Sequence, residues 1–121
     1  MSKTVLTIDD SRTMLSMLRM ALVPAGFEVL QAEDGVQGLQ VLETCTPDVI
    51  VTDINMPNLD GFGLIERVRE TQRHAGVPIL VLTTESGADK KQRARDAGAT
   101  GWIVKPFDAA RLVDAVRRVS M

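Results

Sequence analysis

Short runs of apolar residues alternate along this chain with segments in which apolar residues recur every three or four positions. The runs are three to five residues long and rich in Val, Ile and Leu, which is typical of β-strands. We expect strands over residues 4–8, 27–30, 49–51, 79–82 and 102–104. Within each run the apolar residues are nearly continuous. This pattern indicates strands that are buried on both faces, as in a parallel sheet between two layers of helices.

The intervening segments have the periodicity of amphipathic helices. Asp34 and Asp108 stand where a helix N-cap is needed, and Gly98 stands where a helix end favours glycine. The predicted helices cover residues 14–23 before Pro24, a segment after Asp34, a segment through residues 64–68, about 86–97, and a last segment from Asp108.

Alternation of strands and helices predicts a doubly wound α/β fold, because crossovers between parallel strands are right-handed. The 121 residues are enough for one domain with a real core, and the 45% hydrophobic and 25% charged contents are ordinary for a globular protein. No repeat or linker interrupts the pattern. We therefore expect residues 1–121 to form one domain that ends with its fifth helix and has no attached output domain.

Charge is distributed unevenly although the net charge is only −2. Residues 1–85 carry six basic side chains against twelve acidic ones, whereas residues 86–121 carry eight against four. No apolar run approaches the roughly 18 residues of a membrane span, and no signal-peptide pattern opens the chain. These features predict a cytoplasmic protein. The sole histidine, His74, lies in a polar stretch and is expected in a loop.

The residues at which the predicted strands end carry the candidate chemistry. Strand one ends on Asp9 and Asp10, strand three on Asp53, strand four on Thr83 and strand five on Lys105. Ligand sites of doubly wound folds lie beyond the carboxyl ends of the strands, so these side chains should meet at one rim. Taken singly, each has a structural explanation; Asp9 or Asp10, for example, could cap the first helix.

Taken together, the three carboxylates predict a cation site. Two carboxylates about 4 Å apart repel by about 4 kcal/mol at an effective dielectric near 20, so an empty cluster of three is costly. Oxygen ligands without sulfur or imidazole favour Mg²⁺, which keeps coordination positions for phosphate oxygens. A carboxylate beside Mg²⁺ and a lysine is also suited to phosphoryl transfer, with an aspartyl phosphate as the covalent product.

The whole chain resembles the receiver domain of response regulators. The resemblance rests on Asp9-Asp10, Asp53, Thr83 and Lys105-Pro106 in this order, and on two longer stretches, residues 51–57 with Asp60-Gly61 and residues 101–107. It implies a flavodoxin-like, CheY-like five-stranded sheet of order 2-1-3-4-5. The chain length further resembles that of single-domain chemotaxis regulators.

The resemblance also implies roles for the acidic residues. Asp53 would be the phosphoacceptor, and Asp10 and Asp53 would bind Mg²⁺ directly. The backbone carbonyl of Asn55 would be a further ligand, and Asp9 would act mostly through water. The protein would assist only its own phosphorylation and dephosphorylation and would not be an enzyme.

Further roles follow from the same resemblance for residues around the acidic cluster. Lys105 would pair with Asp53 before phosphorylation and with the phosphate afterwards, and the Lys105–Pro106 peptide bond would be cis. Thr83 and Trp102 would form the switch, although the family more often has Tyr or Phe at the position of Trp102. Asn55 and Glu85 would flank the path of attacking water and influence the lifetime of the phosphate.

The partners implied are a sensor histidine kinase, or its phosphotransfer domain, and a target on the face of the fourth helix, fifth strand and fifth helix. That target could be a flagellar motor switch protein. We expect a monomer without nucleic-acid or membrane partners. A phosphorelay shuttle or a phosphate sink would use the same chemistry, and the sequence does not separate them from a chemotaxis output protein.

Two other protein classes use related folds. A phosphatase of the haloacid dehalogenase type also has a nucleophilic Asp, a hydroxyl residue, a Lys and an acidic pair, but its nucleophile comes first and its pair last. Position 55 is moreover Asn, where that family has an acid/base Asp. A flavodoxin-like FMN carrier needs a phosphate loop after strand one, where this chain has Asp9 and Asp10.

Overall fold

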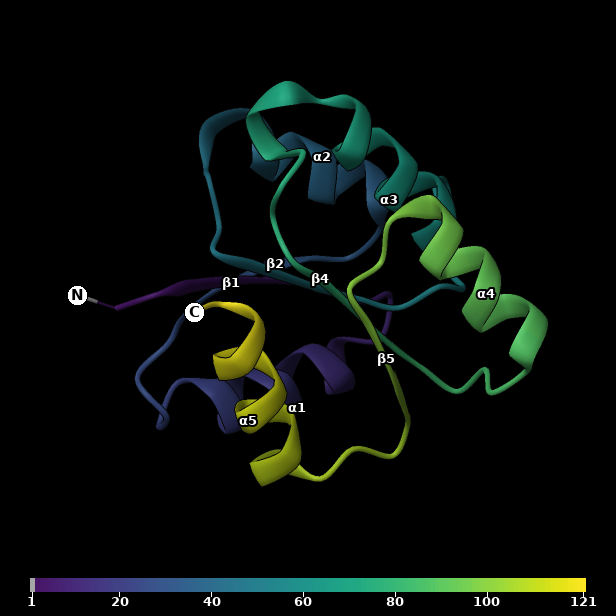
Figure 1. Cartoon of the computed structure of the whole chain (residues 1–121). Helices are drawn as coiled ribbons and strands as arrows, with labels where there is room; N and C mark the ends of the chain where they lie inside the picture. Colours follow the sequence, from purple (N-terminus) through teal and green to yellow (C-terminus); the bar gives the residue numbers. More distant parts are fainter. Residues whose placement is uncertain (1) are drawn as a thin grey trace.

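A five-stranded parallel sheet forms the centre of the protein, whose computed structural model describes residues 2–121 (Figure 1). Its order is β2-β1-β3-β4-β5, as the sequence analysis predicted. The strands are β1 (Thr4–Ile8), β2 (Glu28–Ala32), β3 (Val49–Thr52), β4 (Ile79–Thr83) and β5 (Gly101–Val104). The order reverses at β1, where β2 lies on one side and β3 on the other. This reversal places β1 and β3 side by side at the switch point of the sheet.

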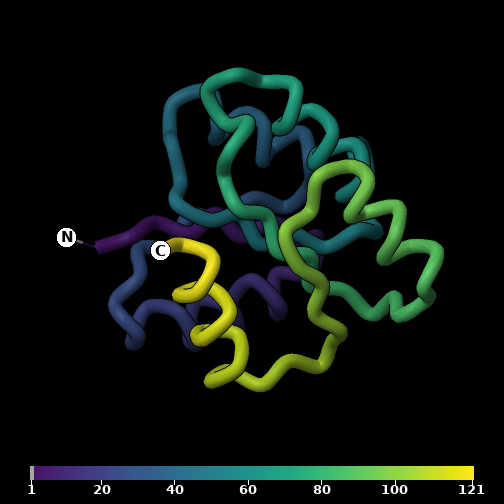
Figure 2. The backbone as a smooth tube through the Cα atoms, in the orientation of Figure 1, coloured from purple at the N-terminus to yellow at the C-terminus, as the bar shows by residue number. Residues whose placement is uncertain are grey.

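Helices cover both faces of the sheet. They are α1 (Arg12–Leu22), α2 (Gly35–Thr44), α3 (Gly61–Glu70), α4 (Ala88–Ala97) and α5 (Ala109–Val119), with a short 3₁₀ helix η1 (Gln72–His74). Figure 1 shows α1 and α5 below the sheet, α2 and α3 above it and α4 on the right beside α3, and the tube in Figure 2 follows the same path. No helix in the part of the chain described here is long and apolar enough to cross a membrane.

Alternate strand residues supply the two halves of the core. Leu6, Ile50 and Val81 pack with the helices of one face, and their neighbours Val5 and Val51 pack with those of the other. All five side chains are at most 1% exposed. Burial of both faces explains why the apolar runs in the sequence are continuous.

The structure shifts three predicted boundaries by about two residues and several others by one residue. Helix α1 begins at Arg12 rather than at residue 14, because the Ser11 side chain accepts a hydrogen bond from the backbone N–H of Met14 and caps the helix. Strand β2 runs to Ala32, where pairing with β1 ends, and not only to residue 30. Helix α4 begins at Ala88 rather than near residue 86.

Candidate functional site

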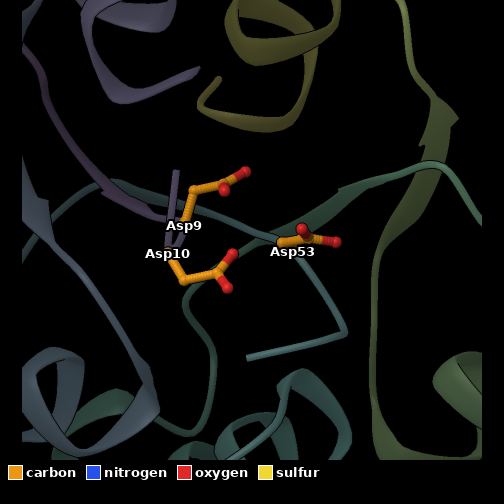
Figure 3. Close-up of side chains that lie close together, drawn as sticks. All are labelled: Asp9, Asp10 and Asp53. Carbon is orange, nitrogen blue, oxygen red and sulfur yellow. The ribbon is translucent and has the colours of Figure 1, made fainter. Parts of the chain in front are cut away.

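Three carboxylates converge at the carboxyl ends of β1 and β3. One ligand oxygen each from Asp9, Asp10 and Asp53 lies within 4.8 Å of the others, and Figure 3 shows the side chains of Asp9 and Asp10 extending toward the side on which Asp53 lies. Asp9 is 2% exposed and Asp53 is 9% exposed, whereas Asp10 is open to solvent. The arrangement is therefore a cluster of two buried carboxylates and one exposed carboxylate, which we call the acidic pocket.

The sheet itself fixes the two buried carboxylates. The Asp53 N–H donates to the carbonyl of Ile8 on β1 (3.0 Å), and the Asp9 N–H donates to the carbonyl of Ala32 on β2 (3.1 Å). The Asp9 side chain accepts a hydrogen bond from the N–H of Ser11 (2.9 Å). The sequence left open that Asp9 or Asp10 caps α1, but Ser11 is the capping residue. Asp9 instead orients the backbone of Ser11.

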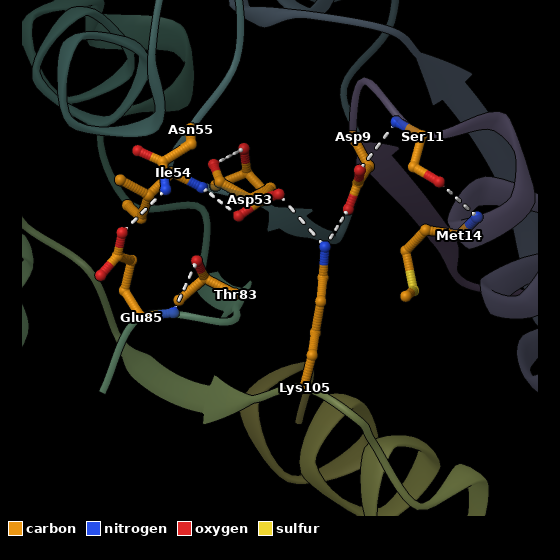
Figure 4. Close-up of polar contacts among 10 residues, drawn as sticks. Asp9, Ser11, Met14, Asp53, Ile54, Asn55, Thr83, Glu85 and Lys105 are labelled. Atoms are coloured by element: carbon orange, nitrogen blue, oxygen red, sulfur yellow. Dashed lines mark hydrogen bonds and ion pairs between the residues drawn. The ribbon is translucent and has the colours of Figure 1, made fainter.

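Lys105 reaches this pocket from the end of β5. Its Nζ lies 2.8 Å from Asp9 Oδ2 and 3.1 Å from Asp53 Oδ2, so one ammonium bridges both buried carboxylates (Figure 4). The Lys105 N–H donates to the carbonyl of Thr83 at the end of β4 (2.8 Å), and the Lys105–Pro106 peptide bond is cis. Residues from four strands thus meet at one rim.

Burial and charge shift the proton affinities within this group. Burial raises the pKa of Asp9 above its ordinary value, and the hydrogen bond from Lys105 only partly offsets this effect. Burial alone would lower the pKa of Lys105, but the hydrogen bonds and charges of Asp9 and Asp53 outweigh this effect and raise the pKa. Lys105 therefore stays protonated at neutral pH.

A second chain of contacts lies on the other side of Asp53. The Glu85 N–H donates to Thr83 Oγ1 (3.3 Å), and the Glu85 carboxylate accepts from Asn55 Nδ2 (3.0 Å). Lys90 Nζ lies 3.0 Å from the same carboxylate. The Asn55 hydrogen bond, followed by that of Lys90, lowers the pKa of Glu85. Glu85 is therefore ionised at neutral pH.

Trp102 is half-buried on β5 and joins this second group. Its indole N–H donates to the backbone carbonyl of Glu85 (3.1 Å). Its ring borders a small cavity of about 40 Å³ that Lys91 and Arg95 also line. The roles of Thr83 and Trp102 as a switch stay predictions.

From the sequence, Lys90 is expected only among the basic residues of the output face, and no contact with Glu85 is predicted. Glu85 and Lys90 are five positions apart and Glu85 precedes α4, so no helical i,i+4 spacing pointed to their contact. Only the path of the chain between β4 and α4 reveals the pair.

The acidic pocket fits the ligand preferences of Mg²⁺. Its oxygen atoms are close enough for more than one to bind the same ion, and no sulfur or imidazole is among them. Asp10 and Asp53, with the backbone carbonyl of Asn55, would hold the ion, and Asp9 would contribute through water. Bound there, Mg²⁺ would neutralise charge on a phosphoryl group.

Comparison with known proteins agrees with this geometry. The family model of the response regulator receiver domain matches residues 5–117. The chain belongs to this family. Receiver domains act in two-component signalling and bind Mg²⁺ at an acidic pocket, so membership favours the receiver interpretation over a phosphatase or an FMN carrier.

Individual receiver proteins resemble the chain over nearly its whole length. The chemotaxis response regulator CheY4 of Vibrio cholerae is 40% identical, with a TM-score of 0.93 and coverage of 98% of this chain and 99% of that one. The magnesium-bound receiver domain of sensor histidine kinase PA1611 from Pseudomonas aeruginosa is 25% identical, with a TM-score of 0.91 and coverage of 99% and 98%.

A transcriptional regulator is equally similar in sequence. The transcriptional regulatory protein PrrA of Mycobacterium tuberculosis is 40% identical over 116 residues, which are 96% of this chain and 49% of PrrA. The chain spans about half the length of the curated relatives it matches. Family membership therefore establishes that the chain is a receiver domain. It does not identify the target that the domain controls or the proteins that it binds.

Proposed function

We propose that Asp53 accepts a phosphoryl group from a phosphohistidine of a sensor kinase or its phosphotransfer domain. The observation that carries the proposal is the position of the Lys105 ammonium, which bridges Asp53 and Asp9 at 3.1 and 2.8 Å beside the three-carboxylate pocket. A nucleophilic carboxylate, a fixed cation and a set of metal ligands are the parts that phosphoryl transfer needs.

In the transfer, a carboxylate oxygen of Asp53 bonds to phosphorus as the bond from phosphorus to the histidine nitrogen breaks. The electron pair of the broken bond stays on the imidazole. Lys105 moves with the charge, from the free carboxylate to a phosphoryl oxygen, and the Thr83 hydroxyl can donate to another oxygen. We place this exchange in the cytoplasm, where ATP-dependent kinases act.

Labelling by acetyl phosphate tests the proposal. With Mg²⁺ we expect about one phosphoryl group per chain, and with excess EDTA we expect none, because the carboxylates would repel the phosphoryl dianion without the metal. Sustained turnover of a phosphomonoester would contradict the proposal, as would labelling that excess EDTA does not reduce. Mass spectrometry of the intact chain measures the stoichiometry.

Replacing Asp10 with Ala is expected to weaken Mg²⁺ binding by at least about 10-fold, since a directly bound carboxylate is lost. Asp10 is exposed, so the fold should tolerate the change. Isothermal titration with Mg²⁺ provides the affinity, and thermal unfolding without metal checks the fold. An unchanged affinity would show that Asp10 is not a ligand.

The output surface in this proposal is the face formed by α4, β5 and α5, on a chain that acts as a monomer. Basic residues gather on its helices, including Arg95, Arg111 and Arg118, so an acidic amphipathic peptide is a suitable partner. The likeness to CheY4 favours a chemotaxis target such as a motor switch protein, and the likeness to PrrA favours transcriptional control. Capture of partners with and without beryllofluoride distinguishes these outputs, and a relay or sink would capture only a phosphotransfer protein.

A further inference from the structure

Lys90 stands outside the acidic pocket but is connected to it through two side chains. Its Nζ contacts Glu85 Oε2 at 3.0 Å, and Glu85 Oε1 accepts a hydrogen bond from Asn55 at 3.0 Å. The two oxygens of one carboxylate are thus engaged by groups from opposite sides. Lys90 lies in the first turn of α4, and Asn55 lies two residues after Asp53. The three side chains therefore join α4 to the segment that follows β3.

The bridge lies beside the reacting carboxylate. Figure 4 shows Asp53 between Asp9 on one side and Asn55 with Glu85 on the other. Lys105 occupies the side toward β5. The hydrogen-bonded side chains of Asn55 and Glu85 thus border a path by which water could reach Asp53. Lys105, Asp9 and Asp10 lie on other sides of Asp53.

We propose that Lys90 is a positioning residue that holds Glu85 and Asn55 across the approach to phosphorylated Asp53 and slows hydrolysis. This inference rests on the proposed phosphorylation of Asp53. In hydrolysis, a water oxygen bonds to phosphorus and the bond from phosphorus to the Asp53 oxygen breaks, with its electron pair left on the carboxylate. Inorganic phosphate leaves, and one proton passes to solvent. Lys90 touches none of the reacting atoms and acts only through Glu85.

The contact predicts the size and the salt dependence of the effect. Lys90 is 48% exposed and Glu85 30% exposed at their side chains, so their ion pair is partly screened by water. Removing an ion pair of this kind should change a rate that depends on it by about two- to fivefold. Salt shortens the Debye length from about 10 Å at 0.1 M to about 3 Å at 1 M, which weakens the pair further.

The test follows the loss of the phosphoryl group after acetyl phosphate is removed, with Mg²⁺ present. We expect Lys90→Met to lose its label about two- to fivefold faster than the wild-type protein in low salt. Lys90→Arg should restore the slow rate, because it keeps the charge. The difference between Lys90→Met and the wild-type protein should shrink in 1 M KCl.

Lys91→Met is the matched control, since Lys91 is the exposed neighbour on α4 and makes no ion pair within residues 2–121. Its decay rate should equal that of the wild-type protein. A Lys90→Met rate equal to or slower than the wild-type rate overturns the positioning role, as does an accelerated rate that salt leaves unchanged. If the wild-type chain takes up no label at all, the proposed phosphorylation fails first and this inference fails with it.

Discussion

Asp53→Asn should reduce phosphoryl uptake from acetyl phosphate to background, a drop of more than about 1000-fold. The amide is neutral and is not a nucleophile toward phosphorus, whereas it has nearly the same shape as the carboxylate. Its oxygen can still accept the hydrogen bond from Ile54 N–H (2.7 Å in the wild-type protein) or that from Lys105. The variant should therefore fold, and its loss of uptake should reflect chemistry alone.

The same substitution should leave the Tm of the metal-free protein equal or higher. One of three clustered negative charges disappears, and with it the repulsion that Lys105 only partly balances. Asp89→Asn, on the exposed first turn of α4, is the control and should be labelled like the wild-type protein. Uptake by Asp53→Asn at the wild-type rate would mean that another residue is the acceptor.

The apolar pattern was sufficient to predict the type of fold. Continuous runs such as residues 49–51 become fully buried β3, and the alternation of runs and helices becomes the doubly wound sheet. The strand order came from the resemblance to receiver domains, because periodicity alone does not say which strands are neighbours. The rim residues were predictable for a topological reason, since parallel strands bring their carboxyl ends to one edge.

Features that depend on tertiary contacts were not predictable. His74 was expected in a loop, but it lies in η1, is 4% exposed, and its Nε2 contacts the carbonyl of Leu42 at 2.8 Å. The bridge from Lys90 to Asn55 joins residues 35 positions apart through Glu85. Neither contact has a local sequence signal, because each depends on how segments that are distant in the sequence approach one another after the sheet has formed.

Gly61→Ala should lower the stability of the protein by about 3 kcal/mol, which corresponds to a fall in Tm of about 10 °C. Gly61 is the first residue of α3, and its N–H donates to the carbonyl of Ile54 (2.8 Å). A Cβ placed on Gly61 would lie 2.9 Å from Ile54 Cα and still closer to the carbonyl oxygen of Asp53. These neighbours are backbone atoms next to β3, so they cannot turn away as a side chain could.

The clash connects the stability of α3 to the position of the phosphoacceptor. Relief requires α3 or the backbone at Asp53 to move, so the folded fraction of Gly61→Ala should also bind Mg²⁺ more weakly. Gly76→Ala is the control, because a Cβ there has no atom within 4 Å, and its stability should change by less than about 1 kcal/mol. Urea unfolding followed by circular dichroism measures both variants. Equal midpoints for the two would show that α3 can withdraw from β3 at no cost, and that the close approach of Gly61 does not hold Asp53 in place.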